Sequence, residues 1–104
     1  MNELREYILL LYNIDYNNFN NNKRVFCSID EAFLEMCCQI LYDLSGLSDF
    51  TIEMDFDEQT EFFINLMLGN VEELNGYEID FDREHWNYTR KDENEKICFE
   101  AKII

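Results

Sequence analysis

The chain begins with apolar residues spaced as on one side of a helix. In the segment 2–12 (NELREYILLLY) they recur at i, i+3, i+4 and i+7, at Leu4, Tyr7, Ile8 and Leu11. This period of 3.6 residues predicts an amphipathic helix over 2–12, with Asn2 as its N-cap. The stretch 17–24 (NNFNNNKR) is rich in Asn, which favours turns, so we expect an exposed loop there.

The longest helical pattern covers residues 29–44. Ser28, followed by Glu31 three positions later, has the form of a capping box. Behind it the apolar residues keep a helical spacing, at Ile29, Ala32, Phe33, Met36, Cys37, Ile40, Leu41 and Leu44. A second, thinner stripe of Leu34, Cys38 and Tyr42 indicates a broad buried face, with a partner helix as the alternative.

The pattern then changes to a period of two. Residues 50–56 (FTIEMDF) alternate strictly, which predicts a half-buried strand with Glu53 and Asp55 on its solvent side. Residues 57–69 (DEQTEFFINLMLG) predict a short helix that stops at Gly69. Residues 77–82 (YEIDFD) alternate again after an Asn-Gly turn signal, and 85–90 with 95–103 predict a closing hairpin.

These elements predict one α+β domain over residues 1–104. About three helices would pack on one face of a small, mostly antiparallel sheet of roughly four strands. The chain length suits a single core, to which nine Phe, six Tyr and one Trp contribute bulk. No apolar run approaches the ~20 residues that span a bilayer, and no signal peptide is recognisable, so we expect a cytoplasmic protein that does not bind membranes.

Charge is the most unusual property of the sequence. The formal net charge is −15. Residues 49–84 hold twelve acids and one base, whereas 1–48 have a net charge of −4 and 85–104 are neutral. One third of the chain therefore carries most of the negative field.

Two rows of acidic residues in this central third lie on the solvent sides of the predicted strands. Glu53 and Asp55 form one row, which Asp57 extends if the strand continues, and the second row is Glu78, Asp80 and Asp82. Residues i and i+2 of a strand lie about 6.4–6.8 Å apart, so such a row approaches the charge density of a nucleic-acid backbone, which has a phosphate every ~3.4 Å of axis. We expect one continuous anionic face that docks in the Lys/Arg-lined groove of a basic, nucleic-acid-binding protein and does not bind nucleic acid itself. A face that serves only solubility is the alternative. The residues expected to bind the partner are Glu53, Asp55, Asp57, Glu58, Glu61, Glu78, Asp80, Asp82 and Glu84.

No motif indicates catalysis, a cofactor or a metal. The four cysteines lack the paired spacing of zinc ligands and read as small apolar residues in a reducing cytosol, at Cys27, Cys37, Cys38 and Cys98. His85 is the only histidine, which disfavours catalytic triads. Residues 55–66 lack the glycine and the final glutamate of an EF-hand loop, and no P-loop is present. We expect a protein that is not an enzyme.

The amino-acid usage of the chain supports a resemblance to a known kind of protein. Twelve Asn and ten Ile, against two Ala, four Arg and no Pro, are typical of an AT-rich genome. In size, charge, usage and absence of motifs the chain resembles small acidic inhibitors encoded by phages, of the anti-CRISPR kind. The resemblance implies a non-catalytic inhibitor that blocks a Cas effector. An immunity protein that neutralises a basic nuclease toxin, or a small accessory or structural phage protein, are the alternatives.

Overall fold

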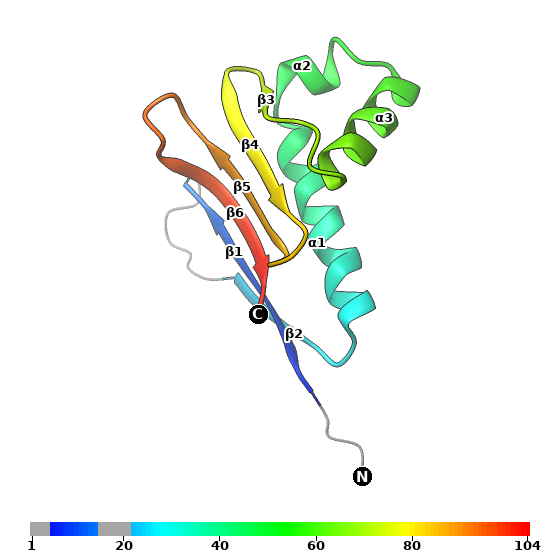
Figure 1. The fold of residues 1–104 in the computed structure, drawn as a ribbon, viewed down its shortest axis with the longest axis vertical. Coiled ribbons are helices and arrows are strands. Elements are labelled where there is room, and N and C mark those ends of the chain that lie inside the picture. The colour runs from blue at the N-terminus through cyan, green and yellow to red at the C-terminus, as the bar shows by residue number, and fades with distance from the viewer. Residues whose placement is uncertain (1–4, 15–21) are drawn as a thin grey trace.

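A computed structural model of the chain describes residues 5–14 and 22–104. Within these ranges the chain forms a six-stranded antiparallel sheet of order β2-β1-β6-β5-β4-β3 and three helices, all on one face of the sheet (Figure 1). The strands are β1 (Tyr7–Asn13), β2 (Asn22–Phe26), β3 (Glu73–Leu74), β4 (Tyr77–Asp82), β5 (Asn87–Lys91) and β6 (Ile97–Ile103). The helices are α1 (Ile29–Leu44), α2 (Ser48–Thr51) and α3 (Phe56–Met67).

The expected sheet of roughly four strands is wrong, and one cause is the start of the chain. The predicted helix over 2–12 is instead strand β1, which pairs with β2 and β6. Its sequence YILLLY is apolar at every position, so it matches the helical period without requiring it and is equally compatible with a strand. Residues 22–24 of the predicted loop belong to β2, and residues 1–4 and 17–21 lie outside the described part.

The predicted strand over 50–56 is also wrong. Residues 48–51 form α2, and Asp55 is the N-cap of α3. The alternation was incidental, because Phe50 is buried while Ile52 and Phe56 are 80% and 79% exposed. The local signal that prevailed is the spacing of Asp55 and Glu58, a capping box that starts a helix at residue 56.

Other elements follow their local signals. Helix α1 has the predicted bounds and Ser28 is its N-cap. The Ser28 Oγ accepts a hydrogen bond from the Asp30 N–H at 3.1 Å and not from Glu31, so the predicted capping box is not formed. Strand β4 also has its predicted bounds, and Asn75 and Gly76 both have positive φ (56° and 81°), as a two-residue hairpin turn between β3 and β4 requires. The second stripe of α1 is not buried, since Leu34 and Tyr42 are 66% and 62% exposed.

The core lies between the sheet and the helices. Its fully buried side chains come from both layers: Leu9, Met36, Ile40, Leu44, Leu66, Ile79 and Tyr88. Ile79 and Phe81 of β4 belong to this core, so the alternating side chains of β4 project from the sheet face that bears no described helix. No helix in the described ranges is long and apolar enough to cross a membrane.

Candidate functional site: an acidic edge of the sheet

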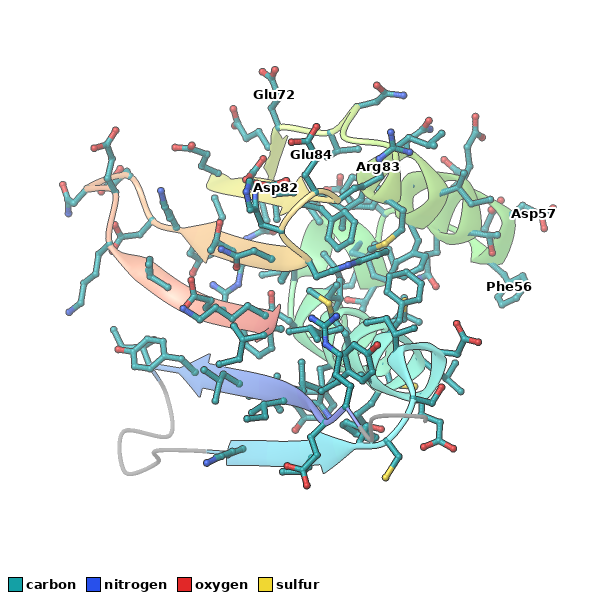
Figure 2. The ribbon with its side chains drawn as sticks, turned by 60° about the horizontal axis from the view of Figure 1, so that its bottom comes forward. Phe56, Asp57, Glu72, Asp82, Arg83 and Glu84 are labelled. Atoms are coloured by element: carbon teal, nitrogen blue, oxygen red, sulfur yellow. The ribbon has the colours of Figure 1, made fainter. Side chains whose placement is uncertain are left out.

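The nine acidic residues expected at the binding face occupy two places in the fold. The first group lies between α2 and α3 and along α3, on the helix side of the sheet: Glu53, Asp55, Asp57, Glu58 and Glu61. The second group lies on the outward face of β4 and in the turn after it: Glu78, Asp80, Asp82 and Glu84. In Figure 2, Asp57 lies at the N-terminal end of α3, and Asp82 and Glu84 lie at the C-terminal end of β4. The two groups are therefore not facing rows on neighbouring strands.

A hollow of about 630 Å³ is lined by Glu78 and Asp80 of the second group and by further acidic residues. It lies over β3, β4 and the turn between β5 and β6. Its wall contains Lys91 as its single base, and seven carboxylates, which we name the acidic edge: Glu72, Glu73, Glu78, Asp80, Asp92, Glu93 and Glu95. The hollow is accordingly strongly anionic.

The pairing of β3 with β4 places like charges opposite each other. Glu73 is the cross-strand neighbour of Glu78, and Glu78 has Lys91 as its neighbour on the other side. Like charges directly opposite in an antiparallel pair destabilise it, by roughly the 0.2–1 kcal/mol that a favourable pair contributes. One lysine offsets only part of this repulsion, so the surface charge here is not arranged for stability.

Three of the nine predicted residues hold local structure. The Asp55 carboxylate accepts the Glu58 N–H at 2.9 Å, and the Glu58 carboxylate accepts the Asp55 N–H at 3.4 Å. Asp82 accepts the N–H groups of Glu84 and His85 and contacts the His85 Nδ1 at 2.7 Å. The hydrogen bond from His85 lowers the pKa of Asp82, and the same contact raises the pKa of His85.

The other predicted carboxylates are available to solvent. Six side-chain carboxylates are exposed and make no hydrogen bond or salt bridge to any described residue: Glu53, Asp57, Glu61, Glu78, Asp80 and Glu84. A charged group without an internal partner keeps its full capacity to bind an external cation. These six are the predicted residues best placed for binding.

A buried ionic cluster lies next to Tyr77, one of the residues that line the hollow. The Arg90 Nε of β5 donates to the carboxylate of Asp43 on α1 at 3.0 Å, and its Nη2 lies 3.0 Å from the Asp43 Oδ1 in a salt bridge. The Tyr88 hydroxyl donates to the same carboxylate at 2.8 Å. The Arg90 guanidinium lies 4.5 Å from the ring centroid of Tyr77, which lines the hollow. Burial raises the pKa of Tyr88. Burial alone would lower the pKa of Arg90, but the hydrogen bonds to Asp43 and the charge of Asp43 outweigh it, so the pKa of Arg90 is raised. The cluster ties α1 to the strands that carry the acidic edge.

Several residues of the hollow and of the buried cluster were not predicted, although the sequence contains signals for them. The Asn75-Gly76 turn closes a two-residue hairpin, and this alone places Glu73 beside Glu78. Asp43 stands in phase with the buried stripe of α1, three residues after Ile40, which marks an acid directed toward the core. An acid on a buried stripe requires a partner, and Arg90 provides it.

The cysteines and the metal-ligand residue types show the following arrangement in the described part of the chain. All four cysteines are free, and burial, together with the neighbouring Cys38, raises the pKa of Cys37 to about 11. A thiol with this pKa is a poor nucleophile at neutral pH. Within residues 5–14 and 22–104, no group of three or more His, Cys, Asp or Glu side chains could hold a metal ion.

No protein-family model, no curated protein and no solved structure matches the chain. Its function is therefore inferred from the acidic edge and its surroundings.

Proposed function

We propose that this protein is a non-catalytic inhibitor that binds a basic, nucleic-acid-binding protein through its acidic surface. The observation that carries the proposal is the hollow over β3 and β4, with seven carboxylates and one lysine in its wall. A Lys- or Arg-rich projection of a partner would find several exposed acceptors there at once, and guanidinium–carboxylate pairs are among the strongest hydrogen-bonded contacts.

The overall charge supports fast association with such a partner. A net charge of −15 on 104 residues creates a field that attracts cationic surfaces and repels nucleic acid. Steering of this kind raises association rates at low ionic strength and is screened over ~8 Å at physiological salt. The field costs stability through self-repulsion, and the opposed Glu73 and Glu78 add to that cost. A binding role explains why so costly an arrangement lies beside a hollow.

The partner we propose first is a Cas effector, acted on in the cytoplasm of a bacterial host. The support is the resemblance in size, charge and residue usage to inhibitors of the anti-CRISPR kind, together with the exposed carboxylates of the acidic edge. The nucleic-acid channel of such an effector is lined with Lys and Arg, because it binds phosphate backbones. An acidic protein that occupies this channel excludes the nucleic acid.

A competition assay tests the proposal. Guide-loaded Cas effectors and basic nucleases are incubated with labelled duplex DNA, and the release of DNA is measured as this protein is added. We expect release by wild-type protein and at least tenfold weaker release by the Glu78→Lys, Asp80→Lys double variant, whose two residues line the hollow. Both of these acids are exposed and without hydrogen-bond partners among the described residues, so the exchange should leave the fold intact.

A matched control separates position from total charge. The Glu6→Lys, Glu31→Lys variant changes the net charge equally, at exposed residues near the start of β1 and in the first turn of α1. It should retain most of the activity. Equal activity of all three proteins, or no release of DNA from any effector or nuclease, would contradict the proposal.

A further inference from the structure

Two large apolar side chains stand almost fully in solvent at the connection between α2 and α3. Ile52 is 80% exposed and Phe56 is 79% exposed, the highest values among the exposed large apolar residues of the described ranges. They are four positions apart, and in Figure 2 the Phe56 ring extends away from the body of the protein beside Asp57. Single exposed apolar residues are ordinary. Ile52 follows α2 and Phe56 begins α3, so the two most exposed of these residues flank one short connection, which makes it a candidate contact surface.

The exposure follows from an ordered backbone. The Gln59 side chain donates to the carbonyl oxygens of Phe50 at 2.9 Å and of Met54 at 3.3 Å, which closes the connection onto α3. The capping box of Asp55 and Glu58 fixes the first turn of α3 directly at Phe56. Ile52 and Phe56 are therefore held outward before any partner arrives, which limits the entropy lost on binding.

The charge around Ile52 and Phe56 restricts the kind of surface that can bind over them. Exposed carboxylates flank both apolar residues on the chain: Glu53, Asp55, Asp57 and Glu58. A second copy of the protein would bring the same negative charges to the contact, and like charges at an interface cost several kcal/mol. A surface with Lys or Arg beside apolar side chains satisfies both the carboxylates and the two apolar residues.

We infer that Ile52 and Phe56 form an apolar anchor that packs against the apolar side chains of a Lys/Arg-rich amphipathic segment of the partner. This inference rests on the proposed function and adds the partner's chemistry: positive charge alone does not suffice. Aromatic side chains in well-packed contacts are frequent binding hot spots, whereas contacts among rim charges contribute mainly to rate. The anchor would slow dissociation of the complex, and the acidic edge would speed association by electrostatic steering.

Two synthetic peptides of equal charge test the anchor. One alternates Arg with Leu and the other alternates Arg with Ser, and their affinities are measured by calorimetry at 50 and 150 mM salt. Wild-type protein should bind the Arg/Leu peptide at least about tenfold more tightly than the Arg/Ser peptide at 150 mM salt. The Ile52→Ala, Phe56→Ala variant should lose this preference and still bind both peptides at 50 mM salt. Because both side chains are exposed, the variant should unfold at the same urea concentration as wild type.

Leu34→Ala is the matched control, since Leu34 is a similarly exposed apolar residue on α1, away from the α2–α3 connection. It should keep the preference for the Arg/Leu peptide. A preference that survives in the Ile52→Ala, Phe56→Ala variant overturns the anchor while leaving the acidic surface in place. Failure of wild-type protein to bind either peptide at 50 mM salt overturns both proposals. A dimer of the free protein that the double substitution abolishes would also overturn the anchor, because the pair would then bind a second copy.

Discussion

Replacing Asp43 should destabilise the protein more than replacing any surface acid. In Asp43→Ala the Arg90 guanidinium, whose side chain is 8% exposed, loses its counter-ion, and the Tyr88 hydroxyl loses its acceptor. Removing one member of a buried ion pair typically costs about 3–5 kcal/mol, because the other charge stays buried and unpaired. Domains of this size have total stabilities of about 5–15 kcal/mol, so the variant should be close to unfolding.

Urea denaturation followed by circular dichroism measures the loss, with the slope of the transition checked against wild type. Tyr88→Phe is the milder companion: it removes one hydrogen bond to a charged acceptor and should cost about 1.5–3 kcal/mol. A double variant, Asp43→Leu with Arg90→Met, should lose much less than the sum of its single variants, because no unpaired charge remains. A loss below about 1 kcal/mol in Asp43→Ala would refute the buried cluster as the link between α1 and β5.

Three smaller predictions concern local chemistry. Because its pKa is about 11, the Cys37 thiol should be alkylated by iodoacetamide at pH 8 far more slowly than the exposed Cys27; equal labelling by mass spectrometry would contradict its burial. NMR titration should give His85 a pKa above ~6.5 that Asp82→Asn returns to the ordinary value. In the folded protein the pKa of the His85 imidazole is raised and the pKa of the Asp82 carboxylate is lowered. Their contact therefore stabilises the fold between about pH 4 and 6.5. This stabilisation is lost as the pH rises through the folded pKa of His85, and also as the pH falls through the folded pKa of Asp82. Asp55→Ala should lower stability by about 0.5–2 kcal/mol through loss of the cap, and an unchanged urea midpoint would show that the capping box contributes nothing.

Elements with strong local signals could be predicted from the sequence. The capped, 16-residue pattern of α1 and the Asn-Gly turn before β4 each determine their structure within a few neighbouring residues. Helix α3 was also predicted, although its first residue, Phe56, was assigned to a strand. Local hydrogen bonds at caps and turns do not depend on the remainder of the fold, which is why these predictions held.

Elements decided by distant contacts could not be predicted. Strand β1 is a strand because β2 and β6 pair with it, and β6 is the last strand of the chain. The hollow depends on the same kind of information, because Glu72 and Glu95 line one hollow only when β3, β4 and β5 pair side by side. Charge density along the chain located the anionic third of the molecule, but not the side of the sheet on which each carboxylate lies.

The salt dependence of binding tests the central claim most directly. The association rate with the effector or nuclease identified by DNA competition is measured between 50 and 300 mM NaCl, for wild type and for a Glu73→Gln, Glu78→Gln, Asp80→Asn variant. These three residues line the hollow, and neutralising Glu73 and Glu78 also relieves their repulsion, so the variant should be at least as stable as wild type. If the acidic edge binds the partner, the wild-type rate should fall steeply with salt, and the variant should associate at least about tenfold more slowly at 50 mM with a flatter dependence. Identical rates and identical salt dependence in the two proteins would contradict the claim that the acidic edge is the binding surface.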